Sequence, residues 1–237
     1  MTHIGRRLFY TAAVNGYEVF MFATLRRLPS AVLLLVQLVI ILTVPLLNDG
    51  VTAQAVSWGL SALALVLVAV IIHRMPIFNA VGFVFVVVAL ALNGAVWLGW
   101  HDLAVWANVI EGVAYLYGAA GIVLYVLQDH EVTRDELFAV AAGFTLMAWG
   151  FAFFYSALQG VFPHSIIAAV NSDAPRTWIE LLFMSFSAQT NTGLGDVIAV
   201  HPLGRAISAV QMFCGVMYVV LIVSRLVGLS LSQSVRK

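Results

Sequence analysis

Charged residues are scarce in this chain of 237 amino acids. Only 9% of the residues are charged, against about a quarter in a soluble domain, and 62% are hydrophobic. The mean hydropathy is +1.02. This composition excludes an ordinary soluble domain and is typical of a protein that spans a membrane several times. Eleven basic and eleven acidic side chains cancel, so the sequence offers no basic surface for nucleic acid.

Cysteine is almost absent as well. The single cysteine, Cys214, excludes an intramolecular disulfide and any metal site built from several cysteines. It lies in an apolar run, where a small buried hydrophobic role is expected. The six histidines share no metal-ligand spacing. The composition therefore points to no enzyme and no cofactor.

Long apolar runs are abundant. A helix needs about 20 mostly apolar residues to cross the hydrocarbon core of a bilayer. Six segments meet this requirement: 30–47, 51–73, 77–99, 103–127, 136–160 and 204–229. The gaps between the first four are very short, which favours antiparallel neighbours. We therefore expect an all-α membrane protein with six transmembrane helices.

The chain divides into three parts on this pattern. Residues 1–29 form an N-terminal segment, in which 5–25 is interpreted as an amphipathic helix at the membrane interface. Residues 30–128 form a four-helix unit. The polar stretch QDHEVTRDE then separates this unit from a C-terminal unit over 136–230.

Basic residues set the expected orientation. Arginine and lysine accumulate in cytoplasmic loops, and placing the N-terminus inside puts eight or nine of the eleven basic residues on that side. We therefore expect a multi-pass protein of the cell membrane with both termini cytoplasmic. The segment 161–203 then faces outward.

This outward segment contains a short apolar stretch, PRTWIELLFMSFSAQT, over 175–190. Pro175 suits a helix start, and Asp173 is a candidate cap. About a dozen helical residues cross only half a bilayer, so the sequence predicts a re-entrant helix. The chain must return as non-helical backbone, which is tolerated at that depth only where it is buried in protein or lines a watery cavity. The glycines at 193 and 195 let successive carbonyls turn toward one axis, so the expected ligand is a cation.

These residues resemble the pore domain of the potassium-channel superfamily. The string TNTGLGD, over 190–196, is similar to the TTVGYGD filter of that family. The resemblance implies an outer helix over 136–160, a pore helix over 175–190 and an inner helix over 204–229. Gly215, twenty residues after Gly195, has the spacing of the family's glycine hinge.

The resemblance also implies a site and an assembly. Ion-binding backbone oxygens are expected from the filter residues Thr190, Asn191, Thr192, Gly193, Leu194 and Gly195, with Asp196 at the outer mouth. The ligand would be a monovalent cation, K⁺ or Na⁺. One filter segment supplies only one wall of a carbonyl ring, so a homotetramer is expected.

Three positions depart from the family's filter. Asn191 replaces the threonine of the innermost ion site, Thr192 replaces a valine, and Leu194 replaces a tyrosine whose hydroxyl holds the filter in place. Ser187 and Phe183 stand where some channels have an acid and a tryptophan that brace the filter aspartate. These departures predict potassium conduction with relaxed selectivity.

The four-helix unit resembles a voltage-sensor domain without its charges. Its fourth span contains no basic residue and carries Glu111 instead, so voltage gating of the usual kind is not expected. Glu111 is interpreted either as a functional intramembrane acid or as a buried acid bonded to Asn93 or Asn108. One alternative function is therefore a channel-like transporter subunit or a non-conducting membrane sensor built around Glu111. Another is an intramembrane aspartyl protease using Asp196 in its GxGD string, but no second aspartate falls within a span.

Overall fold

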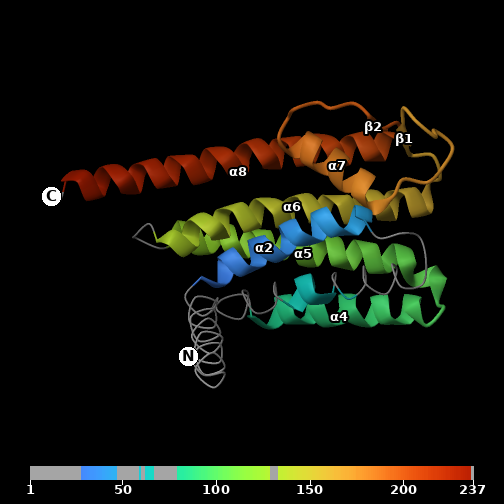
Figure 1. Ribbon diagram of the computed structural model, residues 1–237, viewed down its shortest axis with the longest axis horizontal. Helices are drawn as coiled ribbons and strands as arrows, with labels where there is room; N and C mark the ends of the chain where they lie inside the picture. Colours follow the sequence, from blue (N-terminus) through green and yellow to red (C-terminus); the bar gives the residue numbers. More distant parts are fainter. Residues whose placement is uncertain (1–27, 47–58, 60–61, 67–78, 129–132, 236–237) are drawn as a thin grey trace, which may run out of the picture.

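The computed structural model describes residues 28–46, 59, 62–66, 79–128 and 133–235 (Figure 1). Within these residues the fold is helical, with one small two-stranded sheet. The elements in chain order are α2 (Pro29–Thr43), η1 (Val44–Leu46), α4 (Asn79–Trp97), η2 (His101–Leu103), α5 (Ala104–Gln128), α6 (Arg134–Val161), β1 (Ile166–Ala168), α7 (Trp178–Gln189), β2 (Val197–Ala199) and α8 (Pro202–Val235).

Five of the described helices are long and apolar enough to cross a membrane: Pro29–Leu46, Ala80–Trp97, His101–Leu127, Asp135–Val161 and Pro202–Arg225. They match five of the six predicted spans, which confirms an all-α membrane protein. The remaining predicted span, 51–73, and the predicted interfacial helix, 5–25, lie mostly or wholly outside the described residues. The inner helix is longer than predicted, because α8 continues to Val235.

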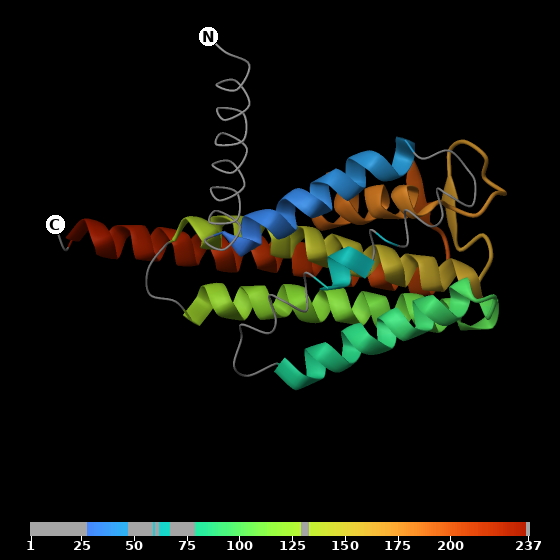
Figure 2. The same ribbon diagram turned by 60° about the horizontal axis from the view of Figure 1, so that its bottom comes forward.

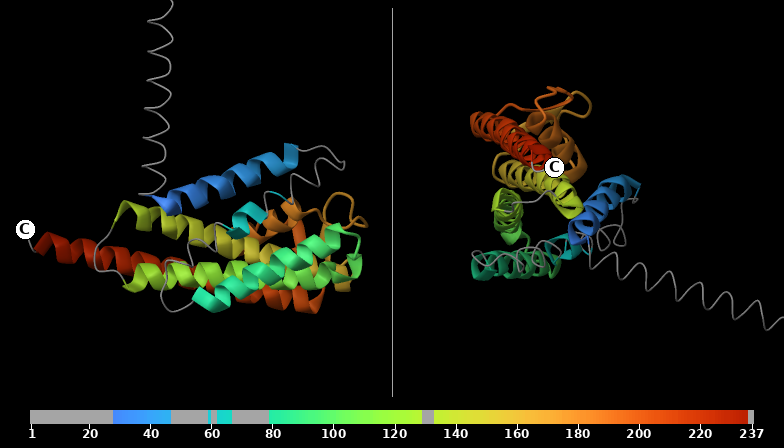
Figure 3. Two further views of the ribbon diagram at one scale, coloured as in Figure 1. Left: turned by 90° about the horizontal axis from the view of Figure 1, so that it is seen from below. Right: turned by 90° about the vertical axis from the view of Figure 1, so that its left-hand side faces the viewer.

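Helix α6 lies at the centre of the molecule. It packs against α5 and α2 on one side and against α7 and α8 on the other, while α4 packs on α5 (Figures 2 and 3). The end-on view of Figure 3 therefore shows a pore half, formed by α6, α7 and α8, next to a half formed by α2, α4 and α5. We call the second group the N-terminal half.

Glycines bring α5 and α6 into backbone contact. A Cβ atom on Gly112 would lie 2.9 Å from the carbonyl oxygen of Gly150, and one on Gly150 would lie 3.0 Å from that of Gly112. Small residues of this kind allow the close approach that stabilises helix pairs in lipid. At these two positions the central helices of the two halves approach too closely to leave space for a further side chain.

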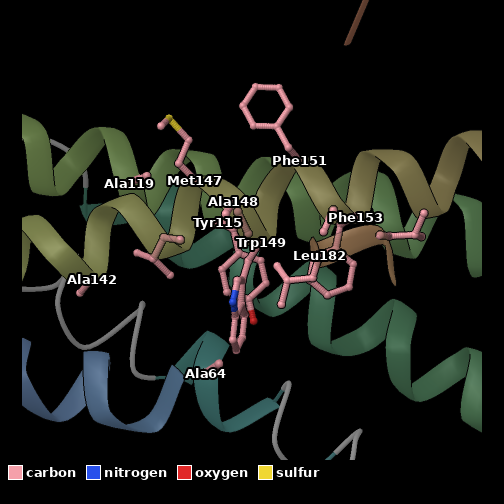
Figure 4. Close-up of a cluster of buried hydrophobic side chains, with 14 of the residues drawn as sticks. Ala64, Tyr115, Ala119, Ala142, Met147, Ala148, Trp149, Phe151, Phe153 and Leu182 are labelled. Atoms are coloured by element: carbon pink, nitrogen blue, oxygen red, sulfur yellow. The ribbon is translucent and has the colours of Figure 1, made fainter. Parts of the chain in front are cut away.

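An aromatic cluster joins α5, α6 and α7 near this contact (Figure 4). Tyr115 stacks on Phe153 at 5.5 Å between ring centroids and meets Trp149 edge-on at 5.6 Å. Trp149 in turn meets Trp178, the first residue of α7, edge-on at 5.3 Å. Such geometries are favourable for aromatic pairs, so the start of α7 is fixed against the centre of the bundle.

The strands β1 and β2 were not predicted from the sequence. They pair antiparallel, with Ile166 opposite Ala199 and Ala168 opposite Val197. The chain leaves the far end of α7 and arcs back to β2, next to β1 and to the loop by which it entered (Figure 1). The segment from β1 to β2 therefore enters and leaves at the same end of the bundle, as a re-entrant segment must.

Candidate functional site

The short helix α7 begins with a capping box. The Thr177 side chain accepts a hydrogen bond from the backbone N–H of Glu180, and the Glu180 carboxylate accepts one from the backbone N–H of Thr177 at 2.7 Å. The predicted cap, Asp173, is therefore wrong, since Pro175 and Arg176 precede the cap in non-helical backbone. At about 1.5 Å per residue, the twelve residues of α7 cross only half a bilayer, as predicted.

A buried arginine holds the loop that leads into α7. Arg176 is 4% exposed, and its guanidinium donates to the carbonyl oxygens of Val170, Asn171 and Ala174. It also forms an ion pair with Glu180 at 3.1 Å. Partial burial raises the pKa of Glu180, but hydrogen bonds from Thr177 and the charge of Arg176 outweigh it, so the pKa lies below its ordinary value. The entrance of the re-entrant segment is thus fixed by charge and by hydrogen bonds.

Two polar side chains of α7 bind the backbone of α6. The Ser185 hydroxyl donates to the carbonyl oxygen of Ala148 at 2.6 Å, and the Gln189 amide donates to that of Phe144 at 2.7 Å. Both side chains are buried, at 0% and 1% exposure. Polar side chains buried between membrane helices require partners, and here they fix the height of the short helix in the bundle.

Gln211 of α8 completes this polar network. Its amide nitrogen donates to the Ser185 carbonyl at 2.9 Å and lies 3.3 Å from Oε1 of Gln189. Its amide oxygen accepts from the Tyr155 hydroxyl at 2.8 Å, which also lies 3.0 Å from the Ser208 hydroxyl. The network joins α6, α7 and α8 directly behind the filter. The sequence analysis missed it; the only signal was the presence of serine and glutamine inside apolar helices.

The filter segment unwinds from the C-terminal end of α7. The backbone N–H groups of Thr190, Asn191 and Thr192 donate to the last carbonyls of the helix, at 2.9, 3.1 and 3.2 Å. Asn191 and Gly193 adopt positive φ values of 55° and 71°. Alternation between right- and left-handed residues directs successive N–H groups to one side of a chain and the carbonyls to the other. The filter residues thus leave the helix as non-helical backbone with two residues in the left-handed region.

The filter carbonyls fall into two groups. In the part of the chain that the structure describes, the carbonyl oxygens of Thr190, Asn191, Thr192, Gly193 and Gly195 accept no hydrogen bond. The carbonyl of Leu194 instead accepts from the Ser187 hydroxyl of α7 at 3.2 Å, and that of Asp196 accepts from the backbone N–H of Ala169 at 3.0 Å. Unpaired carbonyls at membrane depth need a ligand, because lipid offers no donor.

Ser187 therefore holds the filter with two groups. Its hydroxyl binds the Leu194 carbonyl, and its own carbonyl accepts the N–H of Thr192. A pocket of about 320 Å³ lies at the same place, lined by Ser187, Leu194 and Met212 among others. Leu194, which replaces the tyrosine of the filter that this sequence resembles, lines the pocket. The side chain behind the filter is smaller here, and a serine hydroxyl binds the backbone.

The filter is exposed in the single chain. Residues 190–196 are all solvent-accessible, and Leu194 has 56% of its surface exposed. The Asp196 carboxylate is exposed too, and among the described residues it has no hydrogen-bond partner. A polar segment with unpaired carbonyls cannot face lipid, so this surface requires protein or water against it.

Gly215 of α8 touches the end of α7. A Cβ atom at this position would lie 2.0 Å from the carbonyl oxygen of Gln189, far inside any allowed contact. The helix α8 continues through Gly215 from Pro202 to Val235. The structure therefore gives this glycine a packing role beneath the filter, while the hinge function stays a prediction.

The predicted intramembrane acid lies far from the filter. Glu111 is 2% exposed, and its Oε2 accepts a hydrogen bond from the Asn93 amide at 3.0 Å. The expected bond to a polar neighbour is thus confirmed for Asn93. The other carboxylate oxygen, Oε1, is buried and has no partner in the described part of the structure.

Comparison with known proteins agrees with this geometry. Residues 141–229 match a family model described as an ion channel. The matched segment contains most of α6, the re-entrant segment with its filter, and α8 up to residue 229. Neither the curated proteins nor the solved structures gave a significant match.

Proposed function

We propose that four copies of this chain form a channel for monovalent cations, because residues 141–229 match the ion-channel family model. The observation that carries the proposal is the row of exposed filter carbonyls that accept no hydrogen bond, at the end of a half-membrane helix. The C-terminal end of a helix carries partial negative charge, which favours a cation at that point. Carbonyl oxygens replace the hydration shell of the permeating ion, as in the potassium channels that the filter resembles.

The exposure of the filter supports the proposed tetramer. Each chain supplies one wall, and the polar surface over 190–196 is covered only when other copies surround it. Asp196 then stands at the outer mouth as an unpaired carboxylate that attracts cations. The match to the ion-channel family model supports a channel in a membrane. The distribution of basic residues supports an orientation with both termini on the cytoplasmic side of the cell membrane.

We test the channel proposal with ion flux in liposomes. The purified protein is reconstituted in vesicles loaded with potassium, and potassium efflux is followed with an ion-selective electrode. Potassium loss above that of empty vesicles is expected. The control is Gly193→Ala, because Gly193 has a φ of 71° that a side chain disfavours, and this variant should lose most of the flux. Equal flux through both proteins would contradict permeation along this filter.

Permeation is passive, with potassium preferred over sodium by less than in a filter that carries the family's full sequence. The Ser187 hydroxyl holds the Leu194 carbonyl toward α7, so that this oxygen is withheld from the ion path. Fewer carbonyl rings mean weaker discrimination, whether selectivity arises from cavity size or from the number of coordinating dipoles. The helix α5 carries no basic residue, so gating by voltage through this helix is not part of the proposal.

This role of Ser187 predicts a change in selectivity. In Ser187→Ala the Leu194 carbonyl loses its donor and is free to turn toward the ion path, so the ratio of potassium to sodium permeability should rise about five-fold, equivalent to one hydrogen bond of about 1 kcal/mol. Ser187→Thr retains the hydroxyl and should behave like the native protein. A fall in the ratio, or the same change in both variants, would show that the bond does not act in this way. Reversal potentials in planar bilayers give the measurement.

A further inference from the structure

A large cavity lies between the N-terminal half and the pore half, away from the filter. It has a volume of about 620 Å³ and is lined by residues of α2, α4, α5, α6 and α7, together with residues of the short described segment 62–66. On α4 the lining residues Leu90, Asn93 and Trp97 follow one helical face, and on α5 Ala104, Ala107 and Glu111 do the same. The cavity is therefore built into the contact between these helices.

Glu111 is the only charged residue among those that line the cavity in the described part of the chain. Its Oε1 is buried without a partner, so one half of the carboxylate remains available. Asn93 donates both to Oε2 of Glu111 and to the carbonyl of Ala89, each at 3.0 Å. Both amide hydrogens are used in these bonds, which leaves the amide oxygen to accept. The polar groups thus offer acceptors and a negative charge.

Two further polar side chains, Asn108 and Ser156, line the same cavity. The rest of the wall is apolar or aromatic, including Phe153 and Trp178. A metal ion such as Ca²⁺ requires six to eight oxygens at about 2.3–2.6 Å, which a cavity of this size with apolar walls does not supply. The volume lies instead in the range of pockets that hold small organic ligands.

We propose that this cavity binds a small organic ammonium compound, with Glu111 as its counter-ion and the apolar wall around its hydrocarbon part. An aromatic face near a carboxylate is a favourable place for an ammonium group, because the ring attracts the cation. Phe153 and Trp178 belong to the pore half, and Trp178 is the first residue of the pore helix α7. A ligand in the cavity therefore contacts both halves of the chain.

The test measures binding and does not depend on conduction. Benzylamine, charged at neutral pH, is titrated into the full-length protein in nanodiscs of zwitterionic phosphatidylcholine, and heat is recorded by calorimetry. Benzyl alcohol, similar in shape but uncharged, is titrated in parallel. We expect benzylamine to bind about ten-fold more tightly or better, and we expect Glu111→Gln to remove this preference.

Two further variants complete the design. Asp102→Asn makes the same acid-to-amide change at an exposed position outside the cavity and should bind benzylamine like the native protein. Ala107→Leu keeps Glu111 but fills part of the cavity, so binding should weaken even if Glu111→Gln fails to fold. Equal binding of benzylamine and benzyl alcohol, or full benzylamine binding by Ala107→Leu, would overturn the proposal.

Discussion

The two halves of this molecule treat buried polar groups differently. In the pore half, Ser185, Gln189 and Gln211 bind one another and the backbone of α6, and every one of these bonds crosses between helices. In the N-terminal half, Gln37 and Glu111 each keep a buried side-chain oxygen without a partner in the described structure, whereas the pore half leaves the indole nitrogens of two tryptophans without one. Glu111 also lines the cavity of about 620 Å³, whereas Ser185, Gln189 and Gln211 line neither that cavity nor the pocket beside the filter.

This difference distinguishes a short helix that must be held in a fixed position from a buried carboxylate that can bind a ligand. A short helix that ends at mid-membrane has no second anchor in the opposite interface, so its position depends on side-chain bonds to its neighbours. A buried group with a free oxygen is costly and is retained where it can bind something. The difference agrees with the two proposals, in which the pore half holds a fixed filter and the cavity beside the N-terminal half binds a ligand.

The largest effect is expected where the inner helix touches the pore helix. In Gly215→Ala the added methyl group would lie 2.0 Å from the Gln189 carbonyl, so α7 and α8 must separate. We expect loss of ion flux and a large drop in the melting temperature of the proposed tetramer. Fluorescence-detected size-exclusion chromatography after heating measures this temperature. Gly228→Ala is the matched control, because a Cβ atom at this position of the same helix would have no neighbouring atom within 4 Å. A variant that melts like the native protein but conducts poorly would favour a hinge over the packing role.

A smaller effect is expected from breaking the polar network. Gln211→Leu leaves the buried Oε1 of Gln189 without its donor and removes one of the two partners of the Tyr155 hydroxyl, and an unpaired buried group costs about 1–3 kcal/mol. In the N-terminal half, Gln37→Leu removes one long bond of 3.4 Å and one unpaired oxygen, so its stability should change by less than about 1 kcal/mol. Thermal unfolding of both variants makes the comparison. Equal losses of stability in the two variants would show that the two halves do not differ in how strongly their buried polar side chains stabilise the fold.

Restoring the family's residues in the filter should sharpen selectivity by a few-fold. Asn191→Thr combined with Leu194→Tyr returns the innermost ligand and places a ring in the pocket of about 320 Å³ behind the filter. The larger side chain limits movement of the carbonyls, so potassium should be favoured further over sodium. The permeability ratio from reversal potentials measures the change. Unchanged ratios would mean that these departures do not set selectivity.

The smallest effect concerns the entrance of the re-entrant segment. The pKa of Glu180 is lower in the folded protein than its ordinary value, so the ionised carboxylate stabilises the fold above that ordinary value. This contribution is lost as the pH falls through the lowered pKa and Glu180 is protonated. Acidification should therefore reduce the melting temperature of the native protein slightly more than that of Glu180→Gln. Parallel pH profiles of the two proteins would contradict the assignment.

Much of the fold could be predicted from hydropathy, because a span in lipid is set by length and apolar content. The boundaries of α4, α5, α6 and of α2 together with η1 fall within two residues of the predicted segments, and the half-length of α7 followed from its composition. The cap of α7 was misplaced because Asp173 and Thr177 are both suitable capping residues, and only the backbone shows which one begins the helix.

Features that depend on contacts between distant residues could not be predicted. Gln211 and Ser185 are 26 residues apart, and Gln189 and Phe144 are 45 apart, so local pattern gives no sign that they meet. The strands β1 and β2 are three residues long, too short for a periodic signal. For Glu111 the sequence left Asn93 and Asn108 as alternative partners, and the structure shows the bond to Asn93.

The most direct test of the account is a bi-ionic reversal potential, measured on the purified protein in planar bilayers with potassium chloride on one side and sodium chloride on the other. The account predicts a potential displaced toward the potassium limit but short of it, since the free carbonyls of residues 190–193 bind cations while the Leu194 carbonyl is held by Ser187. A current that continues unchanged when both cations are replaced by N-methylglucamine would contradict it.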